Sequence, residues 1–381
     1  MNKINFFEPD IGISEIKNVS KVLKSKWLTM GKITFDFEKK FEEFLIKNSN
    51  ISKKKYCIAT SSATSALHLC LDVLGVKKGD EVIIPTNTFV SSIEVIELVG
   101  ATPVLCDIEF NTHNICLDSI RKKISNKTKV IMPVHYGGKS CDMDQLNKLA
   151  KQHKIKIIED AAHALPTFYK KNIVGSGKNL ICFSFYANKT LTTCEGGMIV
   201  TDSFKFSKLL AKKRLHGISK NAWNRYSNKG NWEYDVTNFG YKYNTNDISS
   251  AIGIIQLQKQ KNNQKKRLFI AKRYMECLDK KVFLPDRIKM EDSSWHLFVI
   301  KIKNRNKLSQ IFKKMGIGHS MHYIPIHRLS YYRNKYKFQS AEYPISERVY
   351  KTSISLPIYP SLTKKNQNKI IKIINNFIHE N

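Results

Sequence analysis

The chain has 381 residues, 42% of them hydrophobic, and a formal net charge of +32. This length suits two or more domains, and the charge is spread over the whole chain, which disfavours a nucleic-acid-binding face. No apolar run approaches the roughly 20 residues of a membrane span, and residues 1–11 lack the apolar segment of a signal peptide. We therefore expect a cytoplasmic protein without a membrane or nucleic-acid partner.

The first half of the chain predicts a mostly parallel sheet. Residues 14–46 have the apolar spacing of two amphipathic helices, separated by the loop 25–32 (SKWLTMGK). From residue 55 onward, short apolar strands alternate with helical segments. The predicted strands are 55–60 (KYCIAT), 81–86 (EVIIPT), 102–108 (TPVLCDI), 129–135 (KVIMPVH), 155–160 (IKIIED) and 196–201 (GGMIVT). Such alternation is typical of an α/β fold with helices on both faces of the sheet.

The second half predicts a smaller α+β domain. A polar and aromatic loop at 218–243 precedes two predicted helices, 247–261 and 264–278. The last hundred residues, roughly, contain a strand (WHLFVIKI), a helix (NKLSQIFKKMG), a His-rich loop and a final helix. We place the division at residue 262, which gives a large domain at 1–262 and a smaller one at 263–381.

Two residues carry the chemistry. Asp160 ends the strand 155–160, and Lys189 lies in a polar turn that ends at Gly196 and Gly197. A carboxylate can keep a pyridine nitrogen protonated while an amine forms a Schiff base, which is the minimum needed to hold pyridoxal phosphate (PLP). Each residue also has a simpler interpretation, because Asp160 could cap a helix and Lys189 could be one surface lysine among many.

Other residues could complete such a site. Small residues at 62–66 leave backbone N–H groups free for a phosphate, and Thr64 adds a hydroxyl, although the same residues suit an ordinary helix cap. Ser184 could also reach a phosphate. Phe89 could stack on a pyridine ring or belong to the core, and His163 could contact the ring oxygen or simply pack.

Metal chemistry is not expected. The eight cysteines are scattered without a CxxC pair, which predicts reduced thiols. His322 and His327 lack an accompanying cluster of Cys, Asp or Glu.

Taken together, the chain resembles the DegT/StrS-type nucleotide-sugar aminotransferases, a branch of the fold-type I PLP enzymes. The resemblance covers nearly the whole sequence. It includes the stretches SSATSALHLCLDVLGVKKGDEVIIPTNTFV, VIMPVHYGGKSCDMD, IIEDAAHALPTFYKKNIVG, FSFYANKTLTTCEGGMIVT, GYKYNTNDISSAIGIIQL, WHLFVIKI and MHYIPIHRLSYY.

The resemblance implies a role for each candidate residue. Lys189 matches the Schiff-base lysine that moves the proton, Asp160 the pyridinium partner, and His163 the residue near the ring hydroxyl. Phe89 matches the stacking aromatic. The implied phosphate ligands are Thr64, Ser65, Ser184 and, from the neighbouring subunit of a homodimer with shared active sites, Asn244. The implied substrate contacts are Trp27, Thr29, Arg225, His322, Tyr323 and His327.

The implied reaction transfers an amino group from L-glutamate to a nucleotide-linked keto-deoxysugar. The segment KYNTNDISSAIG favours amination at C4 over C3, for lipopolysaccharide (O-antigen), capsule or glycan sugars. Thr190 and Cys194 depart from the Asn and Gly usual in relatives, but no catalytic group is lost, so we expect activity. A PLP-dependent sugar dehydratase is one alternative, although that branch has His in place of Lys189. A regulator that keeps the fold without catalysis is another.

Overall fold

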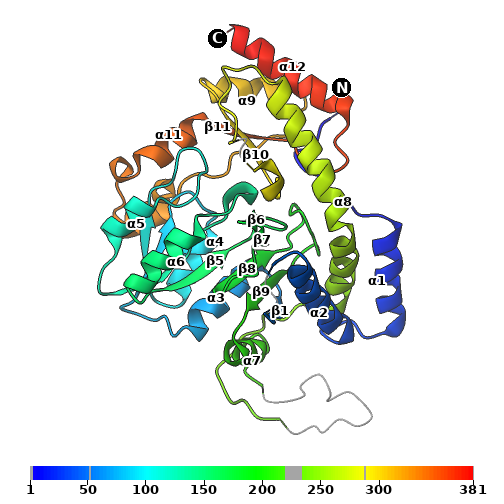
Figure 1. The fold of residues 1–381 in the computed structure, drawn as a ribbon, viewed down its shortest axis with the longest axis vertical. Helices are drawn as coiled ribbons and strands as arrows, with labels where there is room; N and C mark the ends of the chain where they lie inside the picture. The colour runs from blue at the N-terminus through cyan, green and yellow to red at the C-terminus, as the bar shows by residue number, and fades with distance from the viewer. Residues whose placement is uncertain (1–2, 51–52, 219–233, 287–288, 381) are drawn as a thin grey trace.

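The computed structural model describes residues 3–50, 53–218, 234–286 and 289–380. Its centre is a seven-stranded sheet in the order β1-β9-β8-β5-β4-β2-β3 (Figure 1). The strands are β1 (Tyr56–Thr60), β2 (Glu81–Pro85), β3 (Thr102–Cys106), β4 (Thr128–Ile131), β5 (Lys156–Asp160), β8 (Leu180–Ser184) and β9 (Gly197–Thr201). Only β9 runs antiparallel to its neighbours within this sheet; the other neighbouring pairs are parallel. The predicted mostly parallel sheet is confirmed.

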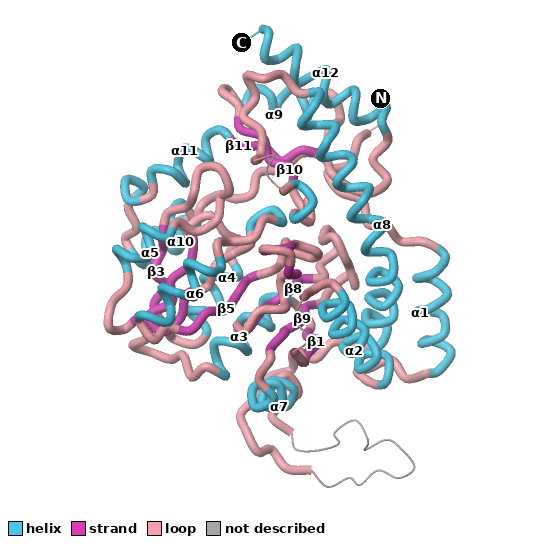
Figure 2. Tube along the Cα trace, in the orientation of Figure 1, coloured by secondary structure: helices cyan, strands magenta, loops and turns pink. Residues whose placement is uncertain are grey.

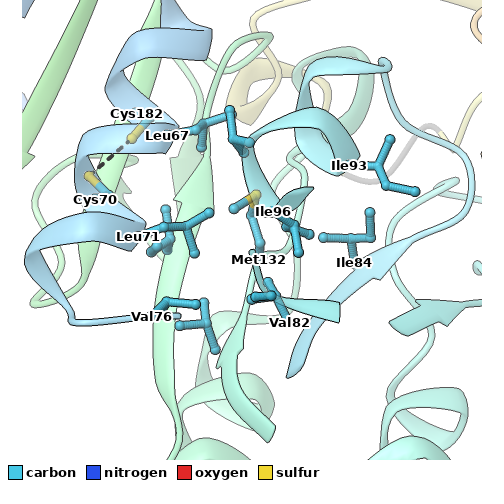
Figure 3. Packing of buried hydrophobic residues seen from close by; sticks show 14 of the residues in the cluster. Leu67, Cys70, Leu71, Val76, Val82, Ile84, Ile93, Ile96, Met132 and Cys182 are labelled. Atoms are coloured by element: carbon cyan, nitrogen blue, oxygen red, sulfur yellow. Dashed lines mark hydrogen bonds between the residues drawn. The ribbon is translucent and has the colours of Figure 1, made fainter. Parts of the chain in front are cut away.

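Helices cover both faces of this sheet. They are α2 (Lys32–Lys47), α3 (Ala63–Val73), α4 (Ser91–Leu98), α5 (Leu117–Lys123), α6 (Met143–Gln152) and α7 (Phe204–Lys213). Alternate strand residues face opposite layers: Ile181 and Phe183 pack with Phe41 of α2, whereas Cys182 packs with Cys70 of α3. Figure 3 shows the α3 side, where the two sulfur atoms lie 3.5 Å apart among aliphatic side chains.

One long helix links the sheet to the rest of the molecule. α8 runs without a break from Asp247 to Cys277, so the prediction of two helices here is wrong (Figure 2). The polar sequence around residue 262 is typical of a loop, but contacts with distant segments stabilise it as part of a helix. Buried Gln260 donates to the carbonyl of Leu165, and buried Arg267 donates to that of Ile358. The division that we placed at residue 262 falls inside this helix.

The C-terminal part is the smaller α+β domain. Its antiparallel strands are β10 (Phe298–Lys301) and β11 (Ser353–Leu356), and its helices are α9 (Arg305–Lys314), α10 (Ser330–Tyr336), α11 (Pro344–Thr352) and α12 (Lys364–Glu380). The chain's beginning also lies here, because Ile4 N–H donates to Gly316 O at 2.9 Å and Gly318 N–H donates to Ile4 O at 2.7 Å. Among the described residues, no helix combines the length and apolarity needed to cross a membrane.

Asp247, the first residue of α8, caps a different helix. Its carboxylate accepts hydrogen bonds from the backbone N–H groups of Gly31, Ile33 and Thr34, at 2.8, 3.2 and 3.0 Å, and from the Thr34 hydroxyl. These groups begin α2, where free N–H groups and the helix dipole favour a negative charge. The bonds tie the loop between α1 (Ile13–Ser25) and α2 to the start of α8.

Candidate active site

The carboxyl ends of the parallel strands bring the candidate residues to one edge of the sheet. Asp160 is the last residue of β5 and Ser184 the last residue of β8. The N-terminus of α3 follows β1, and Phe89 follows β2. Ligands bind at this edge in open α/β sheets, because the loops there can surround them.

Asp160 is a buried carboxylate without a cationic partner in the described part of the chain. It is 5% exposed; Oδ1 accepts from Ala162 N–H at 3.0 Å, and Oδ2 accepts weakly from the Ser92 hydroxyl at 3.5 Å. Burial raises its pKa, while the Ala162 amide and the charge of Lys189 oppose that rise. A protonated ring nitrogen would supply the missing positive charge.

Lys189 is half-buried in the loop between β8 and β9. Its backbone N–H donates to Tyr186 O at 2.9 Å, which holds it in a turn. Burial lowers the pKa of its amine to about 8, although the Asp160 carboxylate acts in the opposite direction. Such an amine is partly neutral near neutral pH, as a nucleophile must be.

His163 has a defined tautomer. Its Nδ1 accepts from Gly137 N–H at 3.2 Å, so its proton is on Nε2, which lies 2.9 Å from the Tyr323 hydroxyl. Burial lowers the pKa of the imidazole well below its usual value, and Lys189 and His322 add to that effect. His163 is therefore neutral and joins the sheet domain to the C-terminal domain.

The proposed phosphate ligands surround the first turn of α3. The Ser65 hydroxyl is used locally, because it donates to Ser62 O at 2.8 Å and accepts from Ser62 N–H at 3.1 Å. Thr64 is half-buried beside it, and the Ser184 hydroxyl accepts from Tyr186 N–H at 3.4 Å. The strand β9 starts against this turn: a Cβ at Gly197 would lie 2.5 Å from Ser62 O, so only glycine permits the approach.

Asn244 lies beside the same turn. The backbone connects them, because Ser61 N–H donates to Tyr243 O at 2.8 Å. The Asn244 side chain donates to Thr245 O at 2.9 Å, and its buried Oδ1 has no hydrogen-bond partner among the described residues. Its contact across a dimer interface stays a prediction.

Phe89 is not a core residue. It is 56% exposed, and its ring centre lies 5.8 Å from that of Tyr323. This exposed position near the Tyr323–His163 pair leaves the ring free to stack on a ligand.

The expected substrate contacts lie at different places in the structure. Tyr323 and His322 lie beside His163, in the group of aromatic side chains at the candidate site. The His322 ring forms a hydrogen bond with the Ser355 hydroxyl at 2.8 Å. Burial lowers the pKa of His322 to about 4, and the charge of Lys189 contributes to that effect. His327 is not available to a substrate. It is completely buried, and its ring nitrogens lie 2.6 Å from the Thr86 hydroxyl and 2.8 Å from a Glu347 oxygen.

The remaining expected contacts lie elsewhere in the chain. Trp27 and Thr29 belong to the loop that Asp247 ties to α8, and no described contact joins them to Asp160 or Lys189. Arg225 lies outside the described residues.

Two residues of the cluster were not predicted. Tyr136 follows the strand β4 and donates its hydroxyl to the His322 carbonyl, with its ring centre 6.2 Å from that of His163. The ring centre of His296 lies 4.4 Å from that of His163, and its buried Nδ1 has no partner in the described part of the chain. Tyr136 could have been found, because it follows the carboxyl end of a predicted parallel strand.

These features fit PLP. An unpaired buried carboxylate, a lysine with a lowered pKa, a helix N-terminus and an exposed aromatic ring meet at one edge of the sheet. Lys189 would hold the cofactor, Asp160 would face its ring nitrogen, and the first turn of α3 would face its phosphate.

Comparison with known proteins agrees with this geometry. The model of the DegT/DnrJ/EryC1/StrS aminotransferase family matches residues 9–375. SpsC, a spore coat polysaccharide biosynthesis protein of Bacillus subtilis, is 37% identical over 97% of this chain and 96% of its own length.

Solved structures agree over the full length. A protein of Streptococcus pneumoniae assigned as a sugar aminotransferase, in its PLP form, has a TM-score of 0.91 at 31% identity, covering 100% of this chain and 99% of that one. PseC of Helicobacter pylori, an aminotransferase of pseudoaminic acid biosynthesis, has a TM-score of 0.90 at 28% identity, covering 100% of both chains. The chain therefore belongs to the DegT/DnrJ/EryC1/StrS aminotransferase family and is a PLP-dependent aminotransferase with the fold-type I architecture.

Proposed function

We propose that the protein transfers an amino group from L-glutamate to the keto carbon of a nucleotide-linked deoxysugar, with C4 favoured over C3. The product would serve the synthesis of lipopolysaccharide, capsule or other glycans in the cytoplasm. Relatives named for polysaccharide and pseudoaminic acid biosynthesis support a sugar substrate. The preference for C4 rests on the segment KYNTNDISSAIG.

One observation carries the proposal: the Asp160 carboxylate is buried without a cationic partner in the described chain, close enough to Lys189 for each to shift the pKa of the other. When bound, PLP supplies the carbonyl that takes up the amino group and the ring that accepts electrons. Asp160 would hold the proton of the ring nitrogen. The Lys189 amine would move a proton to and from the substrate carbon.

The uncharged side chains of His163 and Tyr323 would orient the PLP ring. His163 and Tyr323 share one hydrogen bond, and burial raises the pKa of the Tyr323 hydroxyl well above its usual value. Both groups therefore remain uncharged, and the Tyr323 hydroxyl can donate to a ring oxygen without competing with Asp160. We further propose that the site is completed by a second copy of the chain, with Asn244 reaching the phosphate of its neighbour.

The first test uses purified protein loaded with PLP. L-glutamate is expected to bleach the visible band of the lysine-bound cofactor, because the amine form absorbs at shorter wavelength. Lys189→Ala should show neither the band nor turnover, whereas Lys178→Ala, at an exposed position, should behave as the unmodified protein. An unchanged band in glutamate would refute the proposed donor reaction.

The second test identifies the acceptor. The protein and glutamate are incubated with a panel of UDP-, dTDP- and GDP-linked ketosugars, and the product is analysed by NMR and mass spectrometry. A new amine at C4 is expected. An amine at C3 would overturn the positional preference, and a product that loses a hydroxyl without gaining nitrogen would instead indicate a dehydratase.

A further inference from the structure

A second cavity lies where the sheet domain meets the C-terminal domain. Its volume is about 560 Å³, which is within the range that holds small organic ligands. The wall comes from described residues within 109–117, 136–146, 168–170, 285–286 and 289–301. Asp160, His163, Lys189 and Tyr323 do not line it, but Tyr136 and Gly137, which contact His322 and His163, do, so the cavity adjoins the cofactor site without containing its catalytic residues.

The cavity contains a buried lysine. Lys301, the last residue of β10, is 4% exposed, and its amine donates to Phe110 O at 3.0 Å. The same amine lies 4.7 and 4.4 Å from the ring centres of Phe110 and Phe283. Among the described residues, no carboxylate lies within ion-pair distance of it. Burial lowers its pKa to about 7, and the charges of Lys139 and Arg348 add to that effect.

A histidine lies beside this lysine. His113 is 3% exposed, and its Nε2 lies 3.2 Å from the Lys301 amine. When Lys301 is protonated its amine can only donate, so Nε2 then accepts and the imidazole proton is on Nδ1. That buried Nδ1 has no partner in the described part of the chain. Burial keeps the pKa of His113 well below its usual value, so the ring stays neutral.

The other cations of the wall are neutralised or exposed. Lys139 pairs with Asp286 at 3.1 Å, and Lys170 pairs with Asp144. Lys289 is exposed. Lys301 is therefore the buried cation that a ligand could neutralise, and a buried charge without a counter-charge is costly.

The rest of the wall is mostly apolar. The side chains that give it this character are Ile115, Leu146, Phe168, Trp295, Leu297 and Val299. They come from both domains, and the indole N–H of Trp295 is already bonded to Met290 O at 2.8 Å. An apolar body would fit between them, with its polar end at Lys301.

We propose that this interdomain cavity binds a small monocarboxylate with a flat apolar body, whose carboxylate neutralises the Lys301 amine. The protonated amine has three donors, of which Phe110 O and His113 Nε2 take two, so one donor remains for a carboxylate oxygen. A ligand with two or more negative charges would need further buried cations. The proposal does not depend on the sugar substrate or the amino donor.

Titration calorimetry of the PLP-loaded protein with naphthalene-2-carboxylate tests the site. At pH 8 the Lys301 amine is mostly neutral, and a bound carboxylate raises its pKa, so binding must take up a proton. Heats measured in two buffers of different ionisation enthalpy should reveal this uptake. Binding of one molecule per chain is expected, with an unchanged cofactor spectrum and no displacement by saturating glutamate.

Three comparisons make the test specific. Lys301→Met should weaken binding by about tenfold or more and abolish proton uptake, because the charge-assisted hydrogen bond is lost. Naphthalene-2-carboxamide should bind the unmodified protein no better than the carboxylate binds Lys301→Met. Lys170→Met, at the exposed rim, should leave the affinity unchanged.

A second variant separates binding from folding. Ser140→Phe fills the cavity from its rim and should block the carboxylate while the visible band of the cofactor and the transamination rate persist. The proposal is overturned if no saturable binding occurs, if glutamate displaces the probe, or if Lys301→Met and Ser140→Phe bind it as well as the unmodified protein does.

Discussion

His163 Nε2 and the Tyr323 hydroxyl lie 2.9 Å apart and connect the sheet domain to the C-terminal domain directly at the candidate cofactor site. Because Gly137 N–H occupies Nδ1, His163 must donate to Tyr323. The hydrogen of the Tyr323 hydroxyl is then left for a ligand. The hydroxyl oxygen of Tyr323 therefore holds the C-terminal domain to the sheet domain at the place where the cofactor ring would bind.

Tyr323→Phe removes that acceptor and leaves the Nε2–H of His163 buried without a partner. We expect a loss of about 1–2 kcal/mol in unfolding free energy and about a tenfold lower kcat for transamination. Urea unfolding and steady-state kinetics measure the two effects. Tyr331→Phe, at an exposed tyrosine, serves as the control. Unchanged kinetics in Tyr323→Phe would contradict a role at the ring.

Capture of PLP by the apoprotein should depend on the protonation of Lys189. Its pKa is lowered to about 8, and only the neutral amine attacks a carbonyl, so the rate should rise with pH and level off above about pH 8. Stopped-flow absorbance over pH 6–10 measures the midpoint. A midpoint near the usual lysine pKa would show that the amine is not desolvated.

Asp160→Asn should impair catalysis and shift that midpoint. The carboxylate raises the pKa of Lys189, so its removal should move the midpoint to lower pH. Transamination should fall by about a hundredfold or more, because the ring nitrogen loses its counter-charge. Asp144→Asn, at an exposed aspartate, is the control. A shift to higher pH would contradict the assigned pair.

His327→Ala should affect stability rather than substrate binding. The substitution removes buried contacts with Thr86 and Glu347 and leaves a cavity, which should cost about 2–4 kcal/mol. The KM for the sugar should change by less than about twofold, since a buried side chain of this kind contributes to folding instead. A large rise in the KM for the sugar at unchanged stability would instead indicate that His327 contacts the substrate.

Asp247→Asn should destabilise the start of α2. The carboxylate accepts from three backbone N–H groups and one hydroxyl there, and we expect a loss of about 1–2 kcal/mol on its neutralisation. Urea unfolding measures this loss. Asp36→Asn, on the exposed side of α2, should cost less than about 0.5 kcal/mol.

The sequence allowed good predictions wherever local pattern decided the structure. Apolar strands ending in Asp160 or in the turn before Ser62 indicated both the parallel sheet and the edge where these residues meet. The family resemblance added the PLP assignment, which the comparisons confirm.

Other features depend on contacts between distant segments. The sequence around Asn263 is typical of a loop. It is helical because Gln260 and Arg267 form hydrogen bonds with Leu165 and Ile358, which are remote in sequence. A His-rich segment likewise cannot reveal that the His327 ring is enclosed while Tyr323, four residues earlier, reaches His163. His296 was missed for the same reason.

The continuity of α8 has a mechanical consequence. A helix of this length is a rod of about 45 Å, and it has no joint at residue 262 about which the C-terminal domain could swing. A tilt of that domain must move the whole rod, including Asp247 at its far end. Asp247 accepts a hydrogen bond from the loop that carries Trp27 and Thr29. A displacement of α8 beside α12 would therefore also move this loop, which lies at the other end of the helix (Figure 1).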